Sequence, residues 1–423
     1  MFAPPSSPHA DALLSKEWID NPYPLCEQLR HLTPLAAVGD SGAHLVASWE
    51  LIQEVLAREP DFSANLTGVL YRNDEGAPDI FDLSSLGANA NVIATADEPD
   101  HSVHRALLQP RFKPSFIAEL EAPLHDWVNE ALQPLLADGG GDVISLAEKI
   151  PALVVARLLG LPESDVDYFQ TWAMMGGDML AGEVTLQGLQ FLAEESGRMS
   201  IYLGKHLDAA NAQIASVTTI DNTSDSIMAI LADGVRQGKI NREQALGIAT
   251  VLFGAGGEST AALISSCLLW LARDPEMADQ LRQSPDLIAC FVEEIVRLDP
   301  PFKFHYRVVR RDCELGGYQL RKDHLLLLLW ASANRDADQF EHPDQLLLHR
   351  KHPKSHMGFG RGPHFCIGAV LARLEAKMVL QKLLASTQSI TLADAPPEYA
   401  PSIFVRRLTR LKLRLVSKGH HSA

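Results

Sequence analysis

One cysteine lies in a glycine-rich stretch, "FGRGPHFCIG", which runs from Phe359 to Gly368. Three glycines and a proline surround this Cys366, and from Ala369 the sequence reads as a helix. A cysteine that only fills space in a core packs as a small hydrophobe and needs no such surroundings. A cysteine whose sulfur must face a large, flat partner would need an open turn of this kind. Cys366 is therefore the first candidate for chemistry.

An acid and two alcohols stand in the middle of a long apolar stretch. The sequence between Asn241, a plausible N-cap, and Pro275, a plausible terminator, predicts one very long helix that runs through the centre of the protein. Three glycines between Gly254 and Gly257 interrupt this helix, each at a cost of about 1 kcal/mol relative to alanine. Directly after them come Glu258, Ser259 and Thr260. Either the glycines only allow close helix packing, with the polar groups bonded to backbone, or the helix is deformed and delivers an acid and an alcohol to a ligand.

Charged residues at helical spacing provide further candidates. Glu294 and Arg297 stand three residues apart on a helix face that is otherwise apolar. An ordinary surface pair at this spacing contributes only a few tenths of a kcal/mol. His101 and Arg105 share another predicted helix face at a spacing of four, and Arg307 begins a strand-like stretch. Taken one at a time, each of these residues has a simple structural explanation.

The composition is that of a globular protein with a surplus of acidic residues. The 423 residues include 53 acidic and 37 basic side chains, a formal net charge of -16, which argues against binding to nucleic acid. The five cysteines, at positions 26, 267, 290, 313 and 366, include no C-x-x-C pair and predict neither a disulfide framework nor a zinc site. The start of the chain lacks the pattern of a signal peptide, and the apolar run His324–Asn334 is too short to span a bilayer. We expect a cytoplasmic protein without a membrane span.

Helical periodicity dominates the chain, so we expect a mainly α fold with small β-sheets. Apolar residues recur at helical steps in Phe116–Asp138, and the "GGGD" that follows should end that helix. Strand-like alternation is concentrated in Pro301–Trp330, where the pair Gly316-Gly317 predicts a hairpin turn. No segment has the composition of a linker. Residues 1–423 are therefore predicted to form one domain, although the length alone would favour two or three.

Together these features suit a large planar anion bound in an apolar groove. Haem fits, because its iron accepts a cysteine thiolate and its propionates need arginine and histidine partners. The motif Phe359-x-x-Gly362-x-x-x-Cys366-x-Gly368 resembles the haem-binding signature of the cytochrome P450 family. The other motifs follow in the order of that family: His101-x-x-x-Arg105, Ala255-Gly256-Gly257-Glu258-Ser259, Glu294-x-x-Arg297, Arg307 and Phe340–Arg350. The resemblance covers essentially the whole chain and implies the P450 fold, with haem between the long central helix and the cysteine loop.

The resemblance implies how haem b (iron protoporphyrin IX) is held. Cys366 matches the axial ligand, Phe359 packs against the proximal side, and Gly368 leads into the following helix. The glycines let backbone amides approach the sulfur, and these donors together with the helix amino terminus favour the thiolate. The positions that match propionate contacts are His101, Arg105, Arg307 and His364.

The resemblance also implies the catalytic machinery. Glu258 and Ser259 match the acid and the alcohol that relay protons during oxygen activation, and Thr260 stands next in line to share this task. Serine replaces the commoner threonine, which keeps the hydroxyl but loses the methyl group that restricts its rotamer. The candidate substrate contacts are Gly254, Ala255, Lys303, Phe304 and Phe404.

Lys303 is the unusual residue among these contacts. Strand alternation places Lys303, His305 and Arg307 on one face of the strand-like stretch. On that face Lys303 would anchor a carboxylate at one end of an apolar substrate. Otherwise it turns to solvent, or pairs with a propionate or a nearby carboxylate, because an unpaired buried ammonium is costly.

Glu294 and Arg297 match a pair that braces the cysteine loop in the family. The family often has Arg or His as a third partner where this chain has Gln345. Glutamine can still donate a hydrogen bond, so we expect a weaker brace and an intact fold.

The function implied by the resemblance is that of a bacterial haem-thiolate monooxygenase. It would insert one atom of O2 into an apolar organic substrate, with electrons from NAD(P)H through a separate reductase and a ferredoxin. We expect a monomer. A peroxide-driven peroxygenase and a haem-thiolate binding or sensor protein without turnover are the alternatives. The acid and alcohol of the central helix favour the monooxygenase, because passive binding needs no proton relay.

Overall fold

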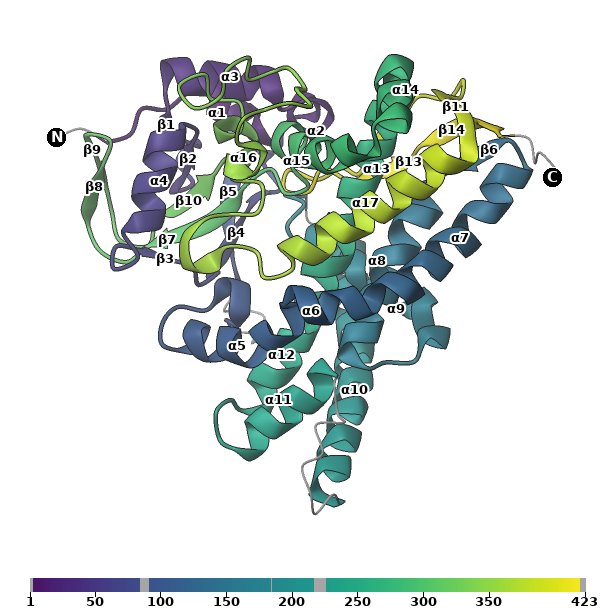
Figure 1. The fold of residues 1–423 in the computed structure, drawn as a ribbon. Coiled ribbons are helices and arrows are strands. Elements are labelled where there is room, and N and C mark those ends of the chain that lie inside the picture. Colours follow the sequence, from purple (N-terminus) through teal and green to yellow (C-terminus); the bar gives the residue numbers. More distant parts are fainter. Residues whose placement is uncertain (1–2, 84–90, 184, 217–225, 419–423) are drawn as a thin grey trace.

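The computed structural model describes residues 3–83, 91–183, 185–216 and 226–418 (Figure 1). The helices are α1 (Pro8–Asp11), α2 (Lys16–Asp20), α3 (Tyr23–Leu32), α4 (Trp49–Ala57), α5 (Asp100–Leu108), α6 (Pro114–Ile117), α7 (Glu121–Ala137), α8 (Ile144–Leu159), α9 (Val166–Met179), α10 (Leu186–Ser216), α11 (Ile227–Arg236), α12 (Arg242–Phe253), α13 (Ser259–Arg273), α14 (Pro275–Gln283), α15 (Ile288–Leu298), α16 (Trp330–Ala333) and α17 (Ala369–Ser386). The strands are β1 (Leu35–Ala37), β2 (Ala43–Val46), β3 (Phe62–Ser63), β4 (Gly68–Arg72), β5 (Pro78–Asp82), β6 (Gly140–Asp142), β7 (His305–Val309), β8 (Cys313–Leu315), β9 (Tyr318–Leu320), β10 (Leu325–Leu328), β11 (Thr387–Leu392), β12 (Glu398–Tyr399), β13 (Leu408–Arg410) and β14 (Lys412–Ser417). This content confirms the expected mainly α fold with small sheets.

A β-rich part and a helical part lie side by side (Figure 1). Among the described residues, five strands form the main sheet in the order β1-β2-β10-β7-β3, with β10 parallel to β2 and the other neighbours antiparallel. In the helical part, α17, which follows the cysteine loop, packs on α13 and α7. The sheet thus carries Arg307 of β7, and the helices carry the acid, the alcohols and the end of the cysteine loop.

The long helix predicted between Asn241 and Pro275 is present and is deformed in its middle. Asn241 caps α12 through a reciprocal pair of hydrogen bonds with Gln244. The segment Gly254–Glu258 forms a π-helical turn before α13 continues the helix. Such turns inside α-helices are frequent at functional sites. The prediction of a deformed helix is therefore confirmed.

The glycines of this turn also permit a close crossing with α9. A Cβ atom on Gly257 would lie 2.5 Å from the Cβ of Ala173, and one on Gly254 would lie 3.7 Å from the Cα of Gly176. The first distance is shorter than real carbon contacts, so Gly257 has no space for a side chain. Close helix packing and helix deformation are therefore both properties of this segment.

Both predicted glycine turns are confirmed. α7 ends at Ala137, and the glycines that follow lead into β6. Gly316 and Gly317 connect β8 and β9 with φ angles of 57° and 84°. Positive φ at both central residues is what a tight hairpin turn requires, and glycine adopts it without strain.

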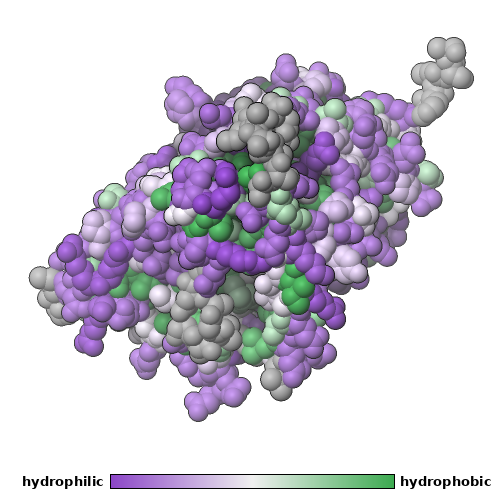
Figure 2. Space-filling view, turned by 90° about the horizontal axis from the view of Figure 1, so that it is seen from below, coloured by the Kyte–Doolittle hydropathy of each residue, from purple (hydrophilic) through white to green (hydrophobic). Residues whose placement is uncertain are grey.

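The central helix is the one described segment, Arg242–Arg273, that is long and apolar enough to cross a membrane. Most of α13 is buried among other helices, which identifies it as a core helix of the protein. Figure 2 shows the face on the side of α10 and α11, where hydrophilic side chains cover most of the surface and hydrophobic ones gather beside a hollow near the middle.

Candidate active site

The cysteine loop is held in shape by its own backbone. The Cys366 N–H donates to the Phe359 carbonyl at 2.9 Å, and the Phe365 N–H donates to the Gly362 carbonyl at 3.0 Å. Gly360 and Gly362 have φ angles of 69° and 70°, a region that side chains with a Cβ rarely adopt. The glycines therefore allow the chain to fold back on itself just before the cysteine.

Opposing influences act on the ionisation of the Cys366 thiol. Burial raises its pKa above the usual value, and a hydrogen bond from the Gly368 N–H and the charges of Arg373 and Arg105 offset part of that rise. Gly368 is also the N-cap of α17, whose positive end lies next to the same sulfur. Cys366 is nevertheless one of the exposed residues, so a ligand can reach it. Coordination to a metal ion would deprotonate the thiol outright.

The four predicted propionate contacts lie near the loop in two groups. Arg105 donates from Nη1 to the Phe365 carbonyl at 2.8 Å and so holds the cysteine loop. His101, Arg307 and His364 line one cavity of about 240 Å³. Within that cavity the ring centroids of His101 and His364 are 4.0 Å apart.

The arginine and histidine side chains of this cavity are buried with few partners from the described part of the protein. Burial lowers the pKa of Arg307 to about 10. Burial, together with the charges of Arg307 and His101, lowers the pKa of His364 to about 3. His364 Nδ1 is buried and has no hydrogen-bond partner within the described part of the chain. Asp97, which also lines the cavity, pairs with Arg310 at 2.5 Å, whereas Arg307 Nη1 donates to the Tyr306 carbonyl and forms no ion pair with a carboxylate of the described residues. The arrangement fits an anionic ligand that would face His364 and Arg307.

The acid and the two alcohols of the central helix differ in exposure. Glu258 is 0% exposed and Thr260 is 3% exposed. Ala255 is exposed and Ser259 is half-buried, and the Ser259 hydroxyl donates to the Ala255 carbonyl at 2.6 Å. Ser259 rather than Thr260 is therefore the alcohol on the open side of the helix.

Glu258 is paired on the opposite side. Arg407 donates from Nε to Glu258 Oε1 at 3.1 Å, and its Nη2 donates to Asp178 Oδ1 at 3.3 Å. Burial raises the pKa of Glu258 to about 8, although Arg407 acts to lower it. The sequence did not indicate that Arg407 would pair with Glu258, because the two residues are far apart in the chain.

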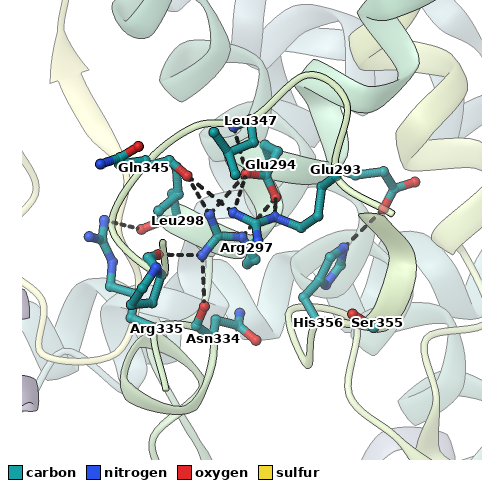
Figure 3. Close-up of polar contacts among 12 residues, drawn as sticks. Glu293, Glu294, Arg297, Leu298, Asn334, Arg335, Gln345, Leu347, Ser355 and His356 are labelled. Carbon is teal, nitrogen blue, oxygen red and sulfur yellow. Dashed lines mark hydrogen bonds and ion pairs between the residues drawn. The ribbon is translucent and has the colours of Figure 1, made fainter. Parts of the chain in front are cut away.

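Glu294 and Arg297 form a fully buried ion pair (Figure 3). Arg297 donates from Nε and Nη2 to the two carboxylate oxygens at 2.8 and 2.9 Å. Arg350 adds a second pair of bonds to the same carboxylate, at 2.8 and 3.2 Å. These bonds hold the pKa of Glu294 below its usual value, although burial acts to raise it.

The expectation that Gln345 is the third partner of this pair is wrong. Only its backbone carbonyl takes part, by accepting a bond from Arg297 Nη2 at 2.8 Å. Figure 3 shows the Gln345 side chain pointing away from the carboxylate. The third partner is Arg350, five residues further on, because the intervening chain turns back toward α15. The Glu294 carboxylate therefore has two arginine partners, Arg297 and Arg350.

A second brace, which the sequence did not reveal, stands beside the first. Glu293 accepts from Arg373 Nη2 at 3.0 Å and contacts His356 Nε2 at 2.9 Å. His356 Nδ1 in turn accepts from the Gly358 N–H at 3.1 Å. Arg373 lies over the Phe359 ring, 4.4 Å from its centroid. The sequence did contain one indication of this brace. Glu293 directly precedes Glu294, so its carboxylate lies on a neighbouring face of the same helix.

Two of the candidate substrate contacts, Lys303 and Phe304, are buried in the structure. Phe304 is 0% exposed and packs within an aromatic cluster, and Lys303 is 1% exposed with Nζ donating to the Ser402 carbonyl at 2.6 Å. The predicted alternation fails because β7 begins only at His305. Before it, Phe302 is half-buried.

The remaining candidates keep accessible surface. Gly254 is half-buried and Ala255 is exposed, whereas Phe404 retains 5% exposure and stacks on Phe302 at 4.6 Å between ring centroids. Phe302, which is half-buried and was not among the candidate contacts, is thus a further aromatic residue of this segment beside Phe404.

The brace leads to a test that separates Arg350 from Gln345. Arg350→Met leaves the buried Glu294 carboxylate with one cation fewer, and we expect the free energy of unfolding to fall by about 3 kcal/mol. Gln345→Ala keeps the backbone carbonyl and should change it by less than about 0.5 kcal/mol. Urea unfolding measures both values. Equal losses in the two variants would contradict the assignment of Arg350.

Comparison with known proteins gives the family. The cytochrome P450 family model matches residues 197–406. Cytochrome P450 144 of Mycobacterium tuberculosis is 37% identical over 96% of this chain and 91% of that protein. Cytochrome P450 109 of Bacillus spizizenii is 31% identical over 94% and 92%.

Solved structures agree with the sequence comparison. CYP109E1 from Bacillus megaterium, solved with testosterone, superposes with a TM-score of 0.79 at 27% identity and covers 94% of this chain and 98% of that one. The full-length match, the cysteine loop and the deformed central helix lead to one conclusion. The chain belongs to the cytochrome P450 family, whose members are oxidoreductases that carry a thiolate-ligated haem.

Proposed function

We propose that this protein is a monooxygenase in which Cys366 is the axial thiolate ligand of the haem. The observation that carries the proposal is the cysteine loop, where Gly368 donates its N–H to the sulfur and Arg105 and Arg373 add positive charge. These groups oppose the rise in the pKa of the thiol that burial causes, and coordination to iron would deprotonate it. We further propose that residues 1–423 act as one domain, because distant parts of the chain supply the site.

The residues around the cavity fit the haem propionates. His101, Arg307 and His364 would hold these carboxylates, since they line one cavity and His364 Nδ1 has no hydrogen-bond partner among the described residues. Arg105 would act mainly by holding the cysteine loop through the Phe365 carbonyl. Bound haem supplies oxygen activation, and its thiolate ligand favours cleavage of the O–O bond.

The protein's own part in this chemistry is to deliver protons on the open side of the central helix. The Ser259 hydroxyl stands at the opening beside Ala255, where it can pass a proton onward. Glu258 holds a proton near neutral pH, because burial raises its pKa to about 8. A buried acid that is protonated at working pH is suited to general acid catalysis. These features support turnover over the alternative of a passive haem-binding protein.

An apolar organic molecule is the proposed substrate. Half-buried Phe302 and exposed Ala255 contribute apolar surface to the site, and buried Phe404 stacks on Phe302. The relative CYP109E1 was solved with testosterone, which is a large apolar molecule. Electrons would come from NAD(P)H through a separate ferredoxin and its reductase, and the protein would act as a cytoplasmic monomer. Product formation with a surrogate ferredoxin system, compared with peroxide alone, separates the monooxygenase from the peroxygenase.

Substrate contacts can be tested by ligand titration of the ferric protein. Lys303→Met should change the affinities for a carboxylic acid and for its neutral ester equally, because the Lys303 ammonium is already bonded to Ser402. Phe302→Ala should weaken both ligands by removing apolar contact area. The spectral shift caused by displacement of water from iron measures binding. Selective loss of the acid in Lys303→Met would restore Lys303 as a substrate anchor.

The ligand assignment has a spectroscopic test. Cys366→Ser removes the thiolate, and we expect a folded protein whose reduced carbon monoxide complex lacks the red-shifted band of thiolate-bound haem. Cys290→Ser, at a half-buried cysteine on another helix, serves as the control and should keep that band. A normal thiolate spectrum in Cys366→Ser would overturn the assignment.

The two alcohols can be separated in the same way. Ser259→Ala should keep substrate binding and divert reduced oxygen to peroxide, because it removes the hydroxyl on the open side of the helix. Thr260→Val should keep the wild-type yield of product per NAD(P)H, since Thr260 is 3% exposed. Oxygen uptake, peroxide and product are measured together. Loss of coupling in Thr260→Val alone would assign the relay to Thr260.

A further inference from the structure

Lys303 is a buried lysine whose charge has no carboxylate partner. Its side chain is 1% exposed, and it forms no ion pair with any residue that the structure describes. Asp299 acts on the charge of Lys303, but Arg406 already donates to that carboxylate. The hydroxyls of Tyr23 and Ser266 donate to Asp299 as well. Because an isolated buried ammonium is costly, the group that Lys303 Nζ contacts must account for its position.

That group belongs to a bend of the backbone at residues 402–404. Lys303 Nζ donates to the Ser402 carbonyl at 2.6 Å, and the Lys303 N–H donates to the Phe404 carbonyl at 2.8 Å. The carbonyl between them, that of Ile403, accepts from the Trp18 indole at 3.1 Å. The three consecutive carbonyls of the 402–404 bend are therefore bonded from outside it, two of them by Lys303.

The N–H groups of the 402–404 bend also have partners. The Ser402 hydroxyl accepts from the Phe404 N–H at 3.2 Å, and the Ser402 N–H donates to the Ala400 carbonyl at 2.8 Å. The Ile403 N–H donates at 2.9 Å to the carbonyl of Ala181, directly after α9, the helix that crosses the central helix. Buried backbone groups that lose their partners are costly. The bend therefore cannot shift without breaking several bonds.

This bend carries an aromatic side chain that belongs to the candidate substrate contacts. Phe404 stacks on Phe302 with 4.6 Å between ring centroids and 20° between ring planes. Phe302 also pairs with Val405 in an antiparallel bridge, and next to it the Arg406 N–H donates to the Pro301 carbonyl at 2.7 Å. The place of the two stacked rings is therefore set by the bonds that hold the bend.

We propose that Lys303 is a positioning residue, which holds the 402–404 bend and so gives the site a rigid aromatic wall made of Phe302 and Phe404. The inference rests on the proposed role of these two side chains as substrate contacts. Trp18 and the Ser402 hydroxyl act on other groups of the same bend. A fixed wall favours a rigid ligand, because little conformational freedom is lost on binding. The site therefore selects apolar ring systems over flexible chains of equal carbon number.

Two imidazoles that bind ferric haem iron test this selectivity. N-dodecylimidazole carries a flexible chain, and N-(para-biphenyl)imidazole carries two linked rings with the same number of carbon atoms. Lys303→Met should weaken binding of the biphenyl ligand by roughly fivefold, which corresponds to the loss of about one hydrogen bond. Binding of the dodecyl ligand should change by less than about twofold, since a flexible chain adapts to a displaced wall. Lys322→Met, at an exposed lysine, is the matched control and should leave both dissociation constants unchanged.

Two further variants loosen the same bend and keep Lys303. Trp18→Phe removes the donor to the Ile403 carbonyl, and Ser402→Ala removes the acceptor of the Phe404 N–H. Each should lower the preference for the biphenyl ligand, as Lys303→Met does. The red-shifted carbon monoxide band identifies the variants that are folded and hold their haem. An unchanged preference in the variants that keep this band would overturn the proposal.

A double-mutant cycle separates positioning from a general effect on the fold. Phe404→Ala removes the ring that the bend carries, so Lys303→Met should cause little further loss of biphenyl affinity in that background. If the two losses add instead, Lys303 does not act through Phe404 and the proposal is wrong. Equal weakening of the biphenyl and dodecyl ligands by Lys303→Met would contradict it as well.

Product formation by the wild-type protein tests the proposed function separately from these binding measurements. Absence of product with a surrogate ferredoxin system, together with the expected binding pattern, would refute the monooxygenase and support the aromatic wall. Product formation together with additive losses in the double variant would support the monooxygenase and remove the role of Lys303.

Discussion

Two adjacent carboxylates on α15, those of Glu293 and Glu294, bind the cationic side chains that hold the cysteine loop in place. Glu294 binds Arg297 and Arg350, and Glu293 binds His356 and Arg373. Each carboxylate is buried or nearly so, and an unpaired charge there would cost several kcal/mol. The chain that supplies these cations must therefore stay close to α15. That chain includes the approach to the cysteine loop and the start of α17.

As a consequence, the residues that lead into the cysteine loop are held in position. His356 holds the Gly358 N–H, and Arg373 lies over the ring of Phe359. The glycine turn that follows is then closed by the bond between the Cys366 N–H and the Phe359 carbonyl. A metal ligand must be positioned closely before the metal binds if it is to set the geometry of the site. The two braces provide that position from outside the site.

The central helix forms the wall of the site opposite the cysteine loop. Its regular α-helical geometry is interrupted at this point. The π-helical turn Gly254–Glu258 removes side chains where α9 crosses and exposes Ala255. It also places a buried acid and a half-buried alcohol at consecutive positions, facing different surroundings. Glycines destabilise a helix, but here they allow the close crossing with α9 and precede the buried acid Glu258.

The sequence by itself determined the elements and the motifs. The cysteine turn, the capped central helix with its glycines, the hairpin at Gly316 and the helix that carries the two glutamates could all be predicted, because each depends on residues that are close in the chain. Motif order was sufficient to identify the family, since the cysteine motif is highly specific.

Only the tertiary structure decided which partners these residues meet. Arg407 lies 149 positions from Glu258, and Arg350 lies 56 from Glu294, so local spacing carried no information about either pair. Lys303 and Phe304 were misplaced because the segment before β7 lacks regular strand geometry. The period of two that assigns faces along a strand holds only where the backbone is in the sheet. The face of a helix or strand that becomes part of the functional site is the face that its packing against other helices and strands leaves open.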